Sequence, residues 1–165
     1  MSVSLSQLEK AHAALQRAIA VHDRVLLGSD IDLIETTRSG VIQNFEVVYE
    51  QSWKVLRELL GSEPNFAVVQ STTPGGQAEG LANLGSDPKN SEESELMQRR
   101  QLYRLAAKNG LLNDVEAWWD FHEARNKTSH TYSPPIALEV AAVARLFDAA
   151  CGQLISQLKA QSIDE

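Results

Sequence analysis

Apolar residues recur every three or four positions along most of the chain, a spacing that is typical of amphipathic helices. Four of the predicted helices cover approximately residues 5–27, 31–60, 94–109 and 135–160, and a fifth follows a cap at Asn113 or Asp114. No stretch shows the sustained alternation that indicates a strand. The pattern therefore predicts an all-α fold, an antiparallel up-and-down helical bundle of four to five helices.

A polar stretch at residues 61–95 interrupts this pattern between the second and third predicted helices. It holds most of the prolines and glycines of the chain, and such a composition is typical of loops. We therefore predict a single domain over residues 1–165 that carries a loop-rich insertion. Most of Ser71–Glu93 is expected to be mobile. Within the insertion, Phe66–Val69 could dock on the domain or form a short strand.

Composition and charge limit the classes of function. Hydrophobic residues make up 43% of the chain, which is sufficient for one core, and no apolar run approaches the roughly 20 residues that span a bilayer. We expect no membrane association. The single cysteine, Cys151, cannot form an intrachain disulfide and is expected to be a buried, inert thiol, which favours a cytoplasmic location. The net charge of −7 argues against a nucleic-acid-binding role for the whole surface.

The stretch from Arg125 to Tyr132 gathers chemically versatile side chains: a guanidinium, a carboxamide, an imidazole and a phenol within eight residues. Pro134 and Pro135 follow at once and cannot continue a helix, so this motif is expected at a helix C-terminus. Arginine suits phosphate, and histidine changes charge near neutral pH. The candidate site residues are Arg125, Asn126, His130 and Tyr132, together with the neighbouring Lys127 and Ser129.

Helical geometry restricts how these groups can cooperate. At about 100° per residue, Arg125 and His130 would lie about 140° apart around an unbroken helix and would not share a face. Asn126 and His130 would share one, because they are four residues apart. Arg125 and His130 can therefore meet at one phosphate only if the helix ends near His130, or if a second chain contributes across a two-fold axis.

Three nearby residues have two interpretations each. His122 could extend the polar face of Asn126 or have an ordinary structural role. Glu46 and Glu50 could form an exposed acidic face, or they could be carboxylates that orient Arg125 or His130. The sequence has no cysteine pair and no metal-binding histidine motif, so we expect neither a metal nor a cofactor.

The motif resembles the Arg-Asn-x-x-Ser-His-x-Tyr sequence found in the HEPN superfamily, and most closely its nucleotidyltransferase substrate-binding family, where it closes a tryptophan-bearing helix. Residues 41–54 resemble the second helix of that family, and residues 5–11 resemble its opening. The resemblance covers about three quarters of the chain. The departure is the stretch 61–95, which is longer than expected between those helices.

The resemblance implies a HEPN toxin, a metal-independent RNase that is neutralised by a partner minimal nucleotidyltransferase. In such an enzyme His130 would act as general acid or base, Arg125 would stabilise charge on the phosphate, and Asn126 would orient the phosphate or His130. Tyr132, either a buried anchor or an exposed phenol, would be open to modification with AMP in the second case.

Two other functions remain open. The chain could be a noncatalytic substrate-binding subunit of a two-component nucleotidyltransferase, or a structural dimer whose polar motif is a satisfied interface. The resemblance also implies a homodimer with the motifs facing a shared groove, with a nucleotidyltransferase chain as partner and RNA or a nucleotide as ligand. A pocket that only a partner protein completes would favour the substrate-binding subunit.

Overall fold

The computed structural model describes residues 5–61 and 88–163, and these residues form five α-helices and one short 3-10 turn. The expected all-α fold is confirmed. The helices are α1 (Leu5–Val25), α2 (Ile31–Leu60), α4 (Pro88–Lys108), α5 (Val115–Lys127) and α6 (Pro134–Ile163), and the 3-10 turn η1 covers Thr128–His130.

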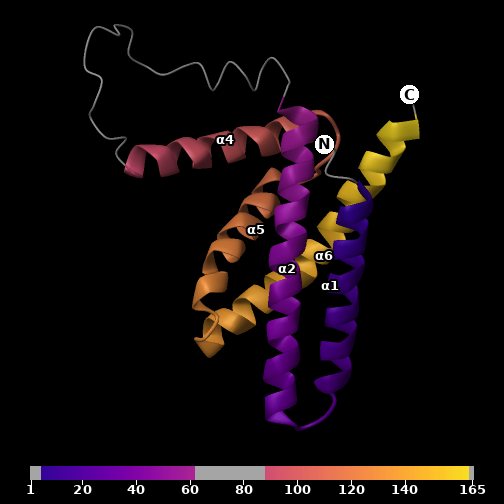
Figure 1. The fold of residues 1–165 in the computed structure, drawn as a ribbon, viewed down its shortest axis with the longest axis vertical. Helices are drawn as coiled ribbons and strands as arrows, with labels where there is room; N and C mark the ends of the chain where they lie inside the picture. Colours follow the sequence, from indigo (N-terminus) through magenta and orange to yellow (C-terminus); the bar gives the residue numbers. More distant parts are fainter. Residues whose placement is uncertain (1–4, 62–87, 164–165) are drawn as a thin grey trace, which may run out of the picture.

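The helices pack as a bundle around the long antiparallel pair α1 and α2 (Figure 1). Helix α6 runs diagonally across this pair and contacts both of its helices. Helix α4 lies across the end of α2 rather than along it. Helix α5, which ends in the motif, contacts α2, α4 and α6. Three helices therefore fix the position of the candidate site.

An aromatic cluster fills the core where α2, α5 and α6 meet. The Phe147 ring centroid lies 5.2 Å from that of Phe121, 5.3 Å from that of Phe45 and 5.5 Å from that of Trp118. All four side chains are buried, and burying a large apolar side chain contributes about 1.5–3 kcal/mol. Cys151 is also buried, as expected, and burial raises the pKa of its thiol to about 12.

Two aspartates cap the starts of helices, and the sequence predicts the second of them, Asp114, as one of two candidates. The Leu33 amide donates to Asp30 Oδ1 at 3.2 Å at the start of α2, and the Ala117 amide donates to Asp114 Oδ1 at 3.1 Å at the start of α5. These caps satisfy amides that have no partner within the helix. The cap at Asp114 sets the register of α5 and hence the direction in which its C-terminal motif points.

The start of α4 differs from the prediction. The helix begins at Pro88 rather than near Ser94, so the end of the expected insertion, including Glu92 and Glu93, is helical and not loop. Proline is favoured at the first position of a helix, where an amide would have no helical partner. The remaining expectations for the insertion, including the role of Phe66–Val69, concern residues 62–87 and lie outside the described residues.

No helix in the described ranges is both long enough and apolar enough to cross a bilayer.

Adjacent residues of α6 provide a matched test of the core. Phe147 is fully buried, whereas the Leu146 side chain is 66% exposed. We expect Phe147→Ala to lower the free energy of unfolding by about 3–5 kcal/mol, because it leaves a cavity in the aromatic cluster. Leu146→Ala should change it by less than about 1 kcal/mol. Urea unfolding followed by circular dichroism measures both, and equal losses would show that the cluster is not the core.

Candidate functional site

The motif lies where the chain reverses between α5 and α6. Helix α5 ends at Lys127, and the 3-10 turn Thr128–His130 follows before α6 starts at Pro134. The Thr128 hydroxyl donates to the Arg125 carbonyl oxygen at 2.7 Å, and the Ser133 amide donates to the His130 carbonyl oxygen at 3.1 Å. These bonds satisfy carbonyl groups that the helix end would otherwise leave without partners. The α-helix therefore stops before His130, so His130 does not follow the α-helical spacing of the residues before it.

Arg125 is held in place by residues on both sides. Its Nε lies 3.3 Å from Glu50 Oε1 of α2, and its Nη1 donates to the Thr128 hydroxyl at 3.3 Å. The buried Nε makes no hydrogen bond with any described residue, so the pairing with Glu50 rests on charge. Of the two carboxylates considered, the structure brings Glu50 to Arg125. Glu46 is half-buried and forms no ion pair or hydrogen bond with the described motif residues.

His130 and Tyr132 face solvent. The Tyr132 side chain is 85% exposed, so it is a free phenol and not a buried anchor. Its ring centroid lies 6.3 Å from that of His130, which is also exposed. Within the described part of the chain, Arg125 and His130 share no hydrogen bond, and His130 Nδ1 and Nε2 have no protein partner. The imidazole is therefore available to a ligand.

Asn126 is tied to a buried histidine. Its Nδ2 lies 3.3 Å from His122 Nε2, and His122 Nδ1 lies 3.2 Å from the Tyr49 hydroxyl. His122 is buried, and its ring packs against the half-buried Trp119 with centroids 5.0 Å apart. Burial, with the nearby charges of Arg99 and Arg125, lowers the pKa of His122 to about 4. His122 is therefore neutral at pH 7 and has a structural position beside the motif.

Two residues of α4 complete this polar cluster. Arg99 of α4 donates from Nη1 to the Tyr49 hydroxyl at 2.9 Å, and its Cζ lies 3.9 Å from the centroid of the Trp53 ring. Tyr103 of α4 forms a hydroxyl–hydroxyl hydrogen bond with Tyr49. Burial raises the pKa of both tyrosines, so both hydroxyls stay protonated at neutral pH.

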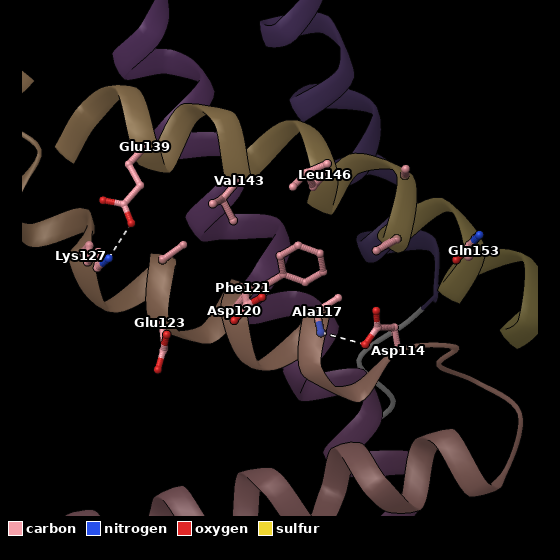
Figure 2. A pocket seen from close by; sticks show the side chains of 13 residues that line it. Asp114, Ala117, Asp120, Phe121, Glu123, Lys127, Glu139, Val143, Leu146 and Gln153 are labelled. Carbon is pink, nitrogen blue, oxygen red and sulfur yellow. Dashed lines mark hydrogen bonds and ion pairs between the residues drawn. The ribbon is translucent and has the colours of Figure 1, made fainter. Parts of the chain in front are cut away.

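Lys127 and Ser129 do not join this cluster. Lys127 Nζ lies 2.6 Å from Glu139 Oε1 of α6, and the Ser129 hydroxyl donates to the Asn126 carbonyl oxygen at 3.4 Å. Figure 2 shows the Lys127–Glu139 pair beside a groove of about 500 Å³ between α5 and α6, with Phe121 inside it. Most of the charged residues that line this groove are carboxylates, namely Asp114, Asp120, Glu123 and Glu139. The groove is therefore unsuited to binding a polyanion.

No group of three or more histidine, cysteine, aspartate or glutamate side chains in the described ranges could hold a metal ion. The chemistry available at the motif is that of a guanidinium, a carboxamide, an imidazole and a phenol.

Sequence reasoning missed three partners of the motif, namely the buried Tyr49 and Tyr103 and the half-buried Arg99. Tyr49 lies in the apolar stripe of its helix, and Arg99 lies far from the motif in the sequence. A signal for their role was present, because a buried tyrosine hydroxyl needs a hydrogen-bond partner, and a tyrosine in an apolar stripe therefore indicates a polar group across the core.

Comparisons with known proteins give consistent results. The family described as "Nucleotidyltransferase substrate binding protein like" matches residues 3–73 and 87–160. A Haemophilus influenzae protein named "Probable ribonuclease HepT" is 25% identical over 159 residues, which is 95% of this chain and 92% of that protein. A solved Haemophilus influenzae structure, described as the fold of a substrate binding domain of a nucleotidyltransferase, has a TM-score of 0.67 and 26% identity, and the match covers 94% of this chain and 99% of that one.

The buried His122 generates a prediction for stability against pH. The unfolded chain protonates this histidine near its ordinary pKa of 6.5, whereas the folded chain does so only near 4. The free energy of unfolding should therefore be at its full value above about pH 7 and should fall as the pH drops from 6.5 towards 4. We expect a contribution of about 1–2 kcal/mol to the loss between pH 7 and pH 5.

Urea unfolding at a series of pH values measures this dependence, with His122→Gln as the comparison. The variant should lose less stability than the parent over the same range, because the group that titrates is absent. His22, whose pKa burial also lowers, remains in both proteins and so cancels in the comparison. Parallel curves for parent and variant would contradict the assignment of this titration to His122.

Proposed function

This chain belongs to the nucleotidyltransferase substrate binding protein like family, and from that premise we propose that it is a metal-independent ribonuclease of the HEPN type, held inactive by a partner nucleotidyltransferase. Support comes from the relative named a probable ribonuclease, with which it aligns over nearly its whole length. The proposed site consists of Arg125, Asn126 and His130, with Tyr132 as the position open to modification.

The observation that carries the proposal is the exposure of His130 and Tyr132, which follow closely in the sequence on an arginine that Glu50 holds in place. An exposed imidazole with no protein partner is suited to proton transfer, because neither ring nitrogen is committed to the fold. A guanidinium whose position is set before a ligand arrives loses little conformational entropy on binding a phosphate.

The chemistry follows from these groups. The ribose 2′-hydroxyl attacks the adjacent phosphorus, the bond to the 5′-oxygen of the next nucleotide breaks, and a cyclic phosphate remains. His130 accepts the proton of the 2′-hydroxyl or donates one to the departing 5′-oxygen. Arg125 stabilises the additional negative charge on the phosphate oxygens. In a homodimer with both motifs facing one groove, the second His130 takes the complementary proton-transfer role.

A specific observation also favours the second function, a noncatalytic subunit that presents substrate to a nucleotidyltransferase. The pairing with Glu50 neutralises much of the charge of Arg125, and Arg125 shares no hydrogen bond with His130 in the described residues. The description of the solved neighbour points the same way, as the fold of a substrate binding domain of a nucleotidyltransferase. In this case the motif would bind a phosphate without cleaving it.

Removal of the imidazole tests the ribonuclease proposal. We expect His130→Ala to lower the rate of RNA cleavage by about 10²–10⁴-fold, the usual contribution of a general acid or base. Arg125→Lys should also lose most of the activity, because an ammonium cannot replace the forked guanidinium. Cleavage of a labelled RNA without added metal, in the presence of EDTA, measures both rates.

Two control variants accompany this test. Gln157→Ala alters an exposed residue of α6, and Arg104→Lys makes the same chemical change as Arg125→Lys at an exposed position of α4. Both should cleave like the parent, and all variants should share its melting temperature. Equal cleavage by parent and His130→Ala would refute the proposal. If neither the parent nor any variant cleaves RNA, but the parent binds a nucleotidyltransferase and Arg125→Ala does not, the second function is supported.

Tyr132 provides a separate prediction. Because its phenol has no necessary role in the proposed step, Tyr132→Phe should keep RNA cleavage within about threefold of the parent. It should abolish the transfer of AMP by the partner nucleotidyltransferase, because the accepting oxygen is missing. Mass spectrometry after incubation with the partner and ATP measures the added mass, and an adduct on Tyr132→Phe would place the modification elsewhere.

A further inference from the structure

A continuous chain of hydrogen bonds runs from helix α4 through the inside of the bundle to the exposed Asn126 of the motif. Arg99 and Tyr103 contact the Tyr49 hydroxyl, Tyr49 contacts His122 Nδ1, and His122 Nε2 contacts Asn126 Nδ2. Tyr49 and Tyr103 are fully buried and His122 is 7% exposed, whereas Asn126 is exposed. Asn126 is therefore held to the core by hydrogen bonds rather than by apolar packing.

Counting the donors and acceptors fixes which atom donates in each of these hydrogen bonds. Asn126 Nδ2 can only donate, so His122 Nε2 is the acceptor, and the proton of the neutral imidazole is on Nδ1. The Tyr49 oxygen then accepts from His122 Nδ1 and from Arg99 Nη1, which uses both of its lone pairs. Tyr49 must therefore donate its own proton to the Tyr103 hydroxyl.

The same assignment shows which atoms of the Asn126 carboxamide remain free to bind a ligand. One Nδ2 proton is committed to His122, and Oδ1 makes no hydrogen bond with any described residue. A carboxamide held in this way presents Oδ1 as an acceptor, which suits a hydroxyl donor, while the second Nδ2 proton can still be donated to another acceptor. Within an RNA ligand the nearest such donor to the reacting phosphate is the ribose 2′-hydroxyl, the group that distinguishes RNA from DNA.

We propose that His122 is the positioning residue of the site: as the Nδ1–H tautomer, fixed by Tyr49, Arg99 and Tyr103, it orients Asn126 so that the carboxamide oxygen accepts a hydrogen bond from the ribose 2′-hydroxyl. The role of the 2′-hydroxyl rests on the proposed ribonuclease function. The orientation of Asn126 does not depend on it, so the two can fail separately.

The neutrality of His122 agrees with this role. An imidazolium would donate from both nitrogens, and Nε2 could no longer accept from Asn126. The burial that lowers the pKa of His122 therefore also preserves the orientation of the carboxamide at neutral pH.

Two substitutions of His122 distinguish a role in orienting Asn126 from a role in packing alone. A glutamine amide reaches about as far as Nε2 of histidine, so its oxygen can accept from Asn126. An asparagine amide reaches only about as far as Nδ1, so it can replace the contact with Tyr49 but not that with Asn126. Both variants place one carboxamide in the same buried volume, and we expect them to lose similar stability.

We expect RNA cleavage by His122→Gln to be at least about tenfold faster than by His122→Asn, with the difference in kcat rather than in KM, since a misplacement of about 1 Å in a reacting geometry can cost about 10²-fold. In nuclear magnetic resonance spectra the Asn126 side-chain amide should keep its dispersed shifts in His122→Gln and move to solvent-exposed values in His122→Asn. Equal behaviour of the two variants in both measurements would overturn the proposal.

A third variant avoids any change in the core. Asn126→Asp replaces the donor at an exposed position by a carboxylate, which can only accept. We expect His122 to switch to the Nε2–H tautomer, which the ¹⁵N shifts of its two ring nitrogens distinguish. Retention of the Nδ1–H form in this variant, or the Nε2–H form in the parent, would refute the positioning role. If the parent shows these signatures but cleaves no RNA, only the ribonuclease function fails.

Discussion

The buried hydroxyl of Tyr49 is the interaction on which the rest of the arrangement depends. A phenol inside a bundle must find partners, because an unsatisfied buried polar group costs about 1–3 kcal/mol. Tyr49 finds them in Arg99 and Tyr103 of α4 and in His122 of α5, so one oxygen of α2 joins three helices. Since α5 carries the motif at its C-terminus, the requirement to satisfy this hydroxyl also determines where the motif lies.

Much of the fold could be predicted because its signals are local. The limits of α2 follow from Asp30, whose side chain caps the helix, and from an apolar stripe that ends at Leu60. The start of α4 could not be found in the same way. Its first two turns, residues 88–95, contain no apolar residue, and without an apolar face a helix has the composition of a loop. The only sequence signals for a helix in these residues were their intrinsic helical propensity and the proline at the first position.

The candidate site, like the fold, was predictable only where its signals are local in the sequence. The motif residues were visible because they are contiguous, and the proline pair indicated that the helix would end near His130. The ion pair of Arg125 with Glu50 was one of two interpretations for that carboxylate, and only packing selects between them. The partners Arg99 and Tyr103 belong to another helix. Their contact with α2 and α5 depends on how α4 crosses them, which periodicity within one helix does not specify.

The ring contact between Trp119 and His122 gives the molecule an optical property. The two centroids lie 5.0 Å apart, and the half-buried indole also lies under the Arg100 guanidinium, whose Cζ is 4.2 Å from its centroid. An imidazolium quenches indole emission far more strongly than a neutral imidazole does. We therefore expect the fluorescence of Trp119 to decrease when His122 becomes protonated, which would make this tryptophan a probe of the hydrogen bonds that hold Asn126.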